Sequence, residues 1–417
     1  MSATNTMNRR ACLLGGLALP LAWSGCAAVA PSGAAPSAAP ALMGSGDLGV
    51  VIERATGTLA IVNTSSRSLL GKVTGLGDLS HASVVFSRDQ RFAYVFGRDG
   101  GLTKVDVLER RIVHRVMQAG NSIGGAISAD GTLVAAQNYT PGGVKVFDAR
   151  TLALVADLPA VIDPVKQSGK PTGQLSRVVG LVDLPGRRFA YSLFDADAIW
   201  IADLSDVAQP KVTKLEGIGR QPYDALVTPD GRHYIAGLFG EDGLAMVDLW
   251  AAEPRVRRIL GGYGRGQQPL PVFKMPHLRG WAVAGRHAYL PAIGRHEVLV
   301  VDTESWQEVG RIPVAGQPVF VIARPDGRQV WVNFAVPDYH RVQVIDTTSR
   351  SVVRTIEPGK AVLHMEFTPR GEAVWISARD ANRVTVYDTQ RIEPVGELAL
   401  DAPSGIFFTA RAARVGF

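Results

Sequence analysis

Residues 319–346 read VFVIARPDGRQVWVNFAVPDYHRVQVID, and short apolar runs alternate there with turns such as the Pro-Asp-Gly of 325–327. Runs of β-branched and aromatic residues between Gly, Asp and Pro turns are typical of antiparallel strands. The stretch ends in an apolar residue followed by aspartate. Similar pairs recur at Val105-Asp106, Phe147-Asp148, Ala202-Asp203, Val247-Asp248, Val301-Asp302, Ile345-Asp346 and Tyr387-Asp388, with Val62-Asn63 as a degenerate first copy. Their spacing of 42 to 55 residues is typical of four-stranded propeller blades and predicts eight of them.

The predicted fold is therefore all-β: one eight-bladed β-propeller over residues 46–417. Only two strands fit between Gly46 and Asn63, so the first blade lacks its inner strand. At the other end, the run 404–409 has no partner of its own. Because blades cannot bury both faces alone, the ring must close. We expect the C-terminal strand to enter the first blade as its inner strand.

The composition excludes several classes of protein. Two cysteines, Cys12 and Cys26, are too few for a disulfide framework, an all-cysteine zinc site, an iron–sulfur cluster or a Cys-x-x-Cys-His haem attachment. The net charge of +6 is spread without a Lys/Arg block, so no nucleic-acid partner is expected. The G-x-G-x-x-G pattern at 44–49 lies between an Ala/Pro-rich segment and a strand. Dinucleotide sites need a strand before and a helix after it, so no NAD is expected.

The N-terminus is predicted to direct export. Arg9 and Arg10 precede an apolar run, 11–23, that is too short to span a bilayer. Small residues then lead to Cys26, as in bacterial lipoprotein signals. We predict a signal peptide over 1–25 and a lipidated Ala/Pro-rich tether over 26–45, with Cys26 acylated. The protein would be periplasmic and lipid-anchored to a membrane, and both the general and the twin-arginine export routes stay open.

The repeat register predicts which residues line a central channel. His81 and His277 both lie 25 residues before the terminal aspartates of their blades, the second and the sixth, which face each other in a ring of eight. Tyr223, Arg177 and His364 fall at or beside the same position. Imidazole is a common haem-iron ligand, and arginine pairs with carboxylates, so this set favours a flat anionic ligand. The alternative is that these histidines are hydrogen-bonded structural residues.

Several stretches in combination resemble a known family over the whole chain after the tether. They are residues 46–54, the block from His81 to 101, and residues 119–125, 220–225, 239–243, 274–277, 362–367 and 403–408. They resemble the NirF family, periplasmic haem d1 biosynthesis proteins of denitrifying bacteria. A more distant resemblance is to the d1-haem propeller of cytochrome cd1 nitrite reductase and to NirN.

This resemblance implies that haem d1 or dihydro-haem d1 binds in the channel. His81 matches the proximal ligand of the haem iron, and His277 matches one distal histidine of cytochrome cd1. The second distal position is Arg324 here, which argues against nitrite reduction. The arginines that match those holding the d1 carboxylates are Arg54, Arg98 and Arg177, and His364 is a further cofactor-binding candidate.

The resemblance implies late-stage modification of a haem d1 precursor for nitrite reductase maturation, with an oxidoreductase-like step. His277 and Tyr223 would be the catalytic, proton-handling groups. Expected partners are the precursor, nitrite reductase and NirN-like maturation proteins. Two alternatives stay open. One is a non-catalytic carrier that delivers haem d1 to apo-nitrite reductase, and the other is an interaction scaffold that binds no tetrapyrrole.

Overall fold

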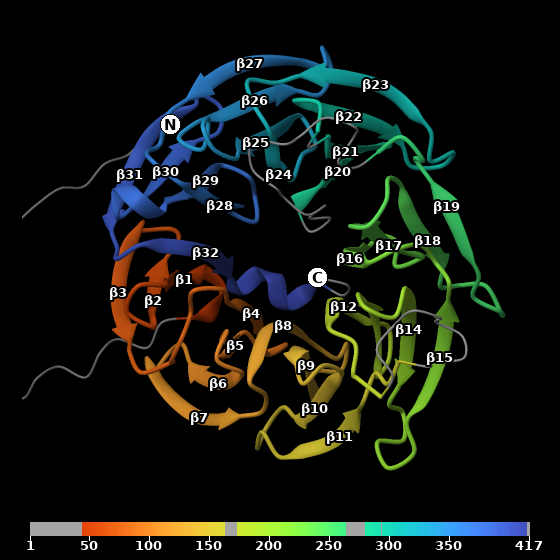
Figure 1. Cartoon of the computed structure of the whole chain (residues 1–417). Coiled ribbons are helices and arrows are strands. Elements are labelled where there is room, and N and C mark those ends of the chain that lie inside the picture. The colour runs from red at the N-terminus through yellow and green to blue at the C-terminus, as the bar shows by residue number, and fades with distance from the viewer. Residues whose placement is uncertain (1–43, 163–172, 264–279, 293, 415–417) are drawn as a thin grey trace, which may run out of the picture. The chain divides into compact units, whose positions relative to one another are not determined.

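Eight four-stranded antiparallel sheets surround a central axis in the computed structural model, which describes residues 44–162, 173–263, 280–292 and 294–414 (Figure 1). The prediction of an all-β, eight-bladed propeller is confirmed. The helices described are the short 3-10 turns η1 (Ser45–Asp47), η3 (Arg379–Ala381) and η4 (Thr409–Ala413). None of them has the length and apolar character needed to cross a bilayer.

The blades follow each other in chain order, and their strands are named here from the axis outward. Blade one consists of β32 (Pro403–Phe408), β1 (Leu48–Glu53), β2 (Thr58–Asn63) and β3 (Ser68–Val73), and blade two of β4 (Ser83–Phe86), β5 (Phe92–Phe96), β6 (Gly101–Asp106) and β7 (Arg111–Met117). Blade three consists of β8 (Asn121–Ile127), β9 (Leu133–Thr140), β10 (Val144–Asp148) and β11 (Leu154–Leu158), and blade four of β12 (Val178–Leu184), β13 (Arg188–Leu193), β14 (Ala198–Asp203) and β15 (Lys211–Glu216).

Blade five consists of β16 (Pro222–Val227), β17 (His233–Leu238), β18 (Leu244–Asp248) and β19 (Val256–Ile259), and blade six of β20 (Ala282–Ala284), β21 (His287–Ala292), β22 (Glu297–Asp302) and β23 (Glu308–Pro313). Blade seven consists of β24 (Pro318–Ala323), β25 (Gln329–Phe334), β26 (Val342–Asp346) and β27 (Ser351–Ile356), and blade eight of β28 (Val362–Phe367), β29 (Ala373–Ala378), β30 (Arg383–Asp388) and β31 (Glu393–Ala399).

The C-terminal strand closes the ring as predicted. β32 pairs antiparallel with β1, placing Phe408 opposite Gly49 and Ile406 opposite Val51. The first blade is therefore built from both ends of the chain. This pairing closes the ring and gives the first blade four strands, like the other seven.

The aspartate that ends the third strand of a blade has a structural function. Asp106 Oδ1 accepts hydrogen bonds from the backbone N–H groups of Leu108 and Glu109, both at 3.0 Å. Asp302 and Asp388 each accept hydrogen bonds from two backbone N–H groups, two and three residues further along, in the same way. Each carboxylate thus fixes the turn into the outer strand, which explains why the residue recurs in the sequence.

The core lies between neighbouring blades. Val182 and Ile199 of blade four pack against Tyr234 and Ala236 of blade five, and similar clusters join other blade pairs. The outer strands are more exposed, as in β7, where every residue is exposed or half-buried. Burial of the three inner strands of each blade accounts for their almost continuous apolar sequence.

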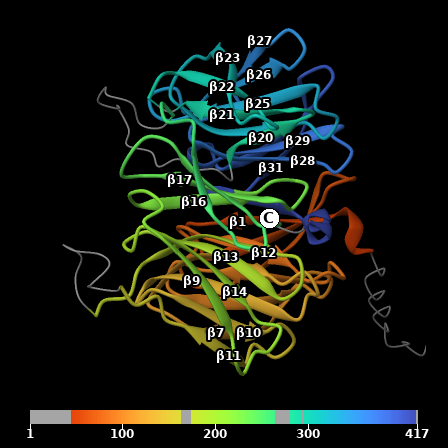
Figure 2. The ribbon, with the colours of Figure 1, turned by 90° about the vertical axis from the view of Figure 1, so that its right-hand side faces the viewer.

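The two faces of the ring are distinguished by strand direction. The Thr409 hydroxyl donates to the backbone oxygens of Ser45 and Leu48, so η1 and η4 lie together where β32 ends (Figure 2). This side is called the C-terminal face. All inner strands run towards it, so Arg88 and Arg324, which follow β4 and β24, lie there. Residues that precede the inner strands lie at the opposite side, called the rim face.

Candidate functional site

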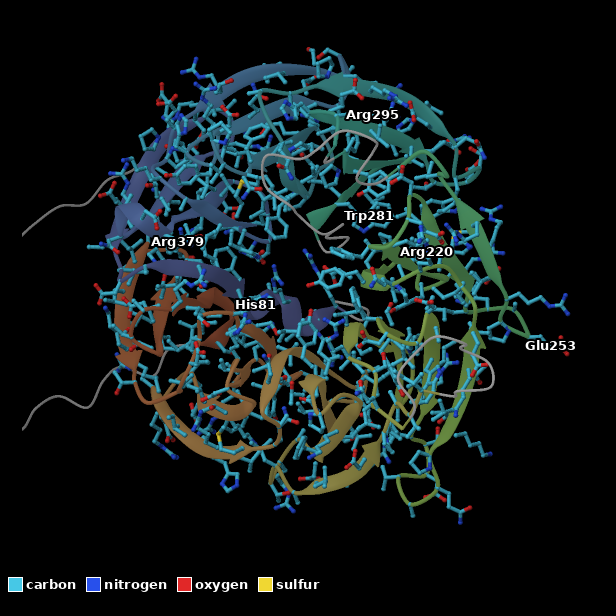
Figure 3. The ribbon with its side chains drawn as sticks, viewed as in Figure 1. His81, Arg220, Glu253, Trp281, Arg295 and Arg379 are labelled. Carbon is cyan, nitrogen blue, oxygen red and sulfur yellow. The ribbon has the colours of Figure 1, made fainter. Side chains whose placement is uncertain are left out.

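His81 lies at the rim face, directly before the inner strand β4. Its side chain is exposed, and Figure 3 shows it beside the centre of the ring. The short strand β4 begins only at Ser83, so the residues before it are free of the sheet ladder. The structure thus places His81 where the repeat register predicted a residue facing the axis.

Three arginines of neighbouring blades gather at the rim face, and we call them the basic rim: Arg54, Arg98 and Arg379. Burial lowers the pKa of Arg54, and the positive charges of Arg379 and Arg98 lower it further, while Asp78 opposes them. Arg379 pairs with Asp380 at 2.6 Å. Within the described residues, the Arg98 guanidinium makes no hydrogen bond or ion pair. Like charges held together in this way favour an anionic ligand.

Arg379 was missed by the sequence reasoning, although a signal for it exists. Arg54, Arg98 and Arg379 all lie in the turn between the second and third strands of their blades. They stand 9, 8 and 9 residues before the terminal residues Asn63, Asp106 and Asp388, by subtraction of residue numbers. Counting back from this second register position would have found Arg379.

Arg177 lies at the same face, before β12 in blade four, but its charge is already balanced. Its Nη2 donates to Asp195 Oδ1 at 2.6 Å, and its Nε donates to Asp195 Oδ2 at 3.0 Å. The guanidinium also lies 4.3 Å from the ring centre of Phe194. These hydrogen bonds raise its pKa. Arg177 therefore offers less unbalanced charge to a ligand than Arg98 does.

Tyr223 opens β16 in blade five and is buried, with 6% of its surface exposed. Its hydroxyl lies 3.1 Å from the hydroxyl of Tyr139, which ends β9 in blade three, and Phe194 and Phe239 pack around its ring. Burial, and then the charge that an ionised Tyr139 would carry, raise the pKa of Tyr223. The phenol of Tyr223 therefore stays protonated at neutral pH. Tyr139 and both phenylalanines were not anticipated from the sequence.

His364 lies in the inner strand β28 of blade eight and contacts both neighbouring blades. Its ring centre is 5.4 Å from that of Phe407 and 6.5 Å from that of Phe320. The backbone N–H of Ile406 donates to His364 Nδ1 at 3.3 Å. Burial, and then the charge of Arg411, lower the pKa of His364 to about 4, so its imidazole is neutral at pH 7.

The structure does not bring Arg324 to the rim face. Its Nε donates to the backbone oxygen of Gly371 at 3.1 Å, and its Nη1 lies 3.5 Å from Asp326 Oδ2. Arg324 thus joins the turns of blades seven and eight at the C-terminal face. Its assignment to the second distal position stays a prediction. The predicted sites His277 and Cys26 lie outside the described residues.

The residues at the rim face fit a flat ligand with carboxylates. In the ranges that the structure describes, no three His, Cys, Asp or Glu side chains are grouped to hold a metal ion by themselves. Two buried polar atoms at the start of the inner strands β4 and β8, Ser83 Oγ and Asn121 Oδ1, have no hydrogen-bond partner among the described residues. Buried polar atoms are normally satisfied. An exposed imidazole, the basic rim and these two atoms together suit a flat anionic ligand with polar groups.

Comparison with known proteins gives consistent matches. The family model described as the cytochrome D1 heme domain matches residues 43–412. The chain is 61% identical over 375 residues to protein NirF of Stutzerimonas stutzeri, covering 90% of this chain and 94% of that protein. It is 59% identical over 377 residues to protein NirF of Pseudomonas aeruginosa, covering 90% and 95%. The solved dihydro-heme d1 dehydrogenase NirN in complex with DHE aligns with a TM-score of 0.77 at 25% identity, covering 91% of this chain and 78% of that one.

Proposed function

The chain belongs to the cytochrome D1 heme domain family, and from this membership we propose that it binds haem d1 or dihydro-haem d1 on its central axis and acts in haem d1 biosynthesis. The observation that carries the proposal is the exposed His81 on the same face of the ring as the basic rim. The names of the two NirF relatives and the NirN complex with DHE support it.

Each part of the rim face has a role in this proposal. His81 would ligate the iron, because a neutral imidazole is a common axial ligand. Arg54, Arg98 and Arg379 would bind the carboxylates, and Arg177 would contribute from blade four. When bound, the tetrapyrrole supplies the redox chemistry of its conjugated ring and iron. Tyr223, held protonated beside Tyr139, would donate a proton or hydrogen bond at the ring edge.

We propose that the protein modifies a late precursor of haem d1, with Tyr223 and His277 handling protons. A non-catalytic carrier that delivers haem d1 to apo-nitrite reductase is the second candidate. It is favoured by the raised pKa of Tyr223, which makes the phenol a weaker acid, and by the lowered pKa of His364, which makes the imidazole a weaker base. Two-electron oxidation of dihydro-haem d1 by the purified protein with an added electron acceptor, abolished by His277→Ala, would support modification. An unchanged ligand would support the carrier.

The cellular setting is also a proposal. The segment with Arg9, Arg10 and Cys26 would export the chain and anchor it to a membrane facing the periplasm. There the protein would meet nitrite reductase and NirN-like maturation proteins. Radiolabelled fatty acid incorporation into the wild-type protein, and its loss in Cys26→Ala, would test the anchor. Equal label in both would contradict it.

The central experiment is titration of the purified protein with haem d1, followed by absorption spectroscopy. We expect His81→Ala to change the spectrum of the bound haem and to weaken binding by at least about tenfold, because the iron loses its axial ligand. His114→Ala, on the exposed outer strand β7, is the matched control and should bind like the wild type. The same spectrum and affinity in His81→Ala as in the wild type would refute the ligand assignment.

A further inference from the structure

His364 is held in place between the two inner strands that neighbour its own. It lies in β28, with the ring of Phe320 from β24 on one side and the ring of Phe407 from β32 on the other. Its backbone is held as well, because its N–H donates to Ser377 Oγ at 3.0 Å. The imidazole therefore cannot swing between blades, and the direction of each ring nitrogen is set by the fold.

The hydrogen bond from Ile406 decides where the imidazole proton is. A backbone N–H can only donate, so Nδ1 must present its lone pair to it, at 3.3 Å. A neutral imidazole has one N–H, and that proton must then be on Nε2. No described residue forms a hydrogen bond with Nε2, which leaves this donor available to a ligand.

The surroundings oppose the charged form. Arg411 approaches from η4 and stacks over Phe407, with its guanidinium carbon 5.0 Å from the ring centre. Among the described residues, Glu366 is the one carboxylate that faces His364; it accepts a hydrogen bond from Arg411 Nε at 2.7 Å, which largely neutralises its charge. An imidazolium would also direct its Nδ1–H at the Ile406 N–H. Burial, the positive charge of Arg411 and the N–H group of Ile406 together keep the imidazole neutral.

This arrangement is incompatible with iron ligation by His364. Ligation through Nε2 needs a lone pair there, so the proton would have to move to Nδ1 and face another N–H group. We propose that His364 is a neutral hydrogen-bond donor, Nε2–H, which binds an acceptor oxygen of the ligand on the axis, and that it is not an iron ligand. The identity of that ligand rests on the function proposed above. The tautomer of the imidazole does not.

The tautomer can be tested in the ligand-free protein. Long-range ¹H–¹⁵N spectra of histidine-labelled full-length protein distinguish the two neutral tautomers and the imidazolium, and His364→Gln identifies the signal. We expect the Nε2–H tautomer throughout the range from about pH 5.5 to about pH 8. The Nδ1–H tautomer, or an imidazolium at pH 7, would overturn the proposal.

Binding of haem d1 tests the donor role with a matched pair of variants. His364→Gln keeps an N–H donor at a similar reach and should bind within about threefold of the wild type. His364→Phe keeps a flat ring without a donor and should bind about tenfold more weakly, the loss expected for one hydrogen bond. His114→Gln and His114→Phe control for the substitutions themselves, and thermal unfolding confirms that all variants fold.

The remaining outcomes are equally decisive. Wild-type affinity in both His364 variants would exclude the donor role. Loss of an axial-ligand spectrum in both would identify His364 as an iron ligand and overturn the proposal. If the wild-type protein binds no haem d1, the proposed function fails, and the spectrum of the free protein alone decides whether His364 is the donor described.

Discussion

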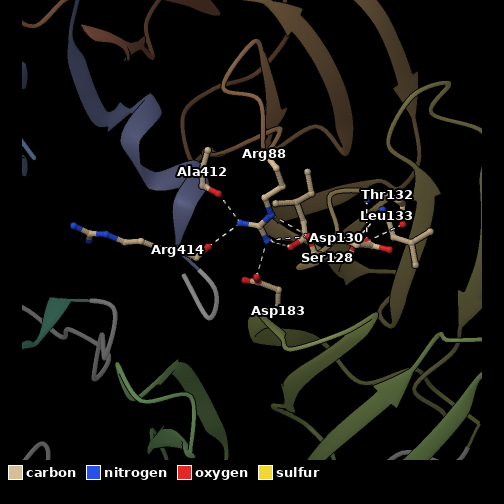
Figure 4. Close-up of polar contacts among 9 residues, drawn as sticks. Arg88, Ser128, Asp130, Thr132, Leu133, Asp183, Ala412 and Arg414 are labelled. Atoms are coloured by element: carbon tan, nitrogen blue, oxygen red, sulfur yellow. Dashed lines mark hydrogen bonds and ion pairs between the residues drawn. The ribbon is translucent and has the colours of Figure 1, made fainter. Parts of the chain in front are cut away.

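Replacing Arg88 by methionine should loosen the C-terminal segment that completes the ring. The Arg88 side chain is only 23% exposed. Its guanidinium donates to Asp183 Oδ2 at 2.9 Å and to the backbone oxygens of Ala412 and Arg414 at 2.9 and 2.8 Å (Figure 4). It also donates to two backbone oxygens of blade three. One side chain thus joins blades two, three and four to the end of η4.

The size of the effect follows from burial. Asp183 has 3% of its side chain exposed, so removal of Arg88 takes away a cation that lies 2.9 Å from a buried carboxylate oxygen. Breaking such a pair costs about 3 kcal/mol in free energy of unfolding. An unfolding entropy of ~2.1 cal/mol/K per residue amounts to ~0.8 kcal/mol per degree for about 370 residues. A loss of about 3 kcal/mol should therefore lower the midpoint of thermal unfolding by about 4 °C.

Two measurements check this prediction. Thermal or urea unfolding should give the loss of stability, and hydrogen exchange should show faster exchange in β32 and η4. Arg187→Met is the matched control, because its pair with Asp130 is similarly short at 2.8 Å but is 41% and 37% exposed. It should cost less than about 1 kcal/mol. Asp183→Asn should restore part of the stability of Arg88→Met. Equal losses for Arg88→Met and Arg187→Met would refute the reasoning.

Three further predictions concern the rim face and the axis. Arg98→Met should weaken haem d1 binding by about tenfold without lowering stability. Arg177→Met should instead lower the free energy of unfolding by about 0.5 kcal/mol, because it breaks an ion pair. Haem titration and urea unfolding of both variants test this difference. Tyr223→Phe should cost about 1 kcal/mol, because the Tyr139 hydroxyl loses its partner, and an unchanged urea midpoint would contradict this. The pKa of His364 lies at about 4 in the folded protein against 6.5 in the unfolded chain, so the unfolded chain binds the proton first as the pH falls. Stability should therefore decrease by up to about 3 kcal/mol between pH 6.5 and pH 4, and His364→Gln should not show this decrease when unfolding is measured at both pH values.

The number of blades and the closure of the ring could be predicted from the sequence because both depend on local signals. The aspartate that ends a third strand, such as Asp106, fixes the next turn with its own neighbours, so its recurrence is visible without any tertiary information. The missing strand in the first blade and the surplus strand at 404–409 then allow a single pairing. His81 could be placed near the axis by the same register, whereas Arg54 was predicted only from the family resemblance.

The contacts within the site required the tertiary structure, because they join residues whose proximity depends on which blades become neighbours and which strand ends meet. Tyr139 meets Tyr223 across blade four, and Ile406, in the strand that closes blade one, sets the tautomer of His364 in blade eight. Arg324 stands one strand length away from the rim face, which a count of residues cannot show. The sequence determines the repeating unit through short-range hydrogen bonds and apolar spacing, while only the closed ring fixes the distances and charges between units.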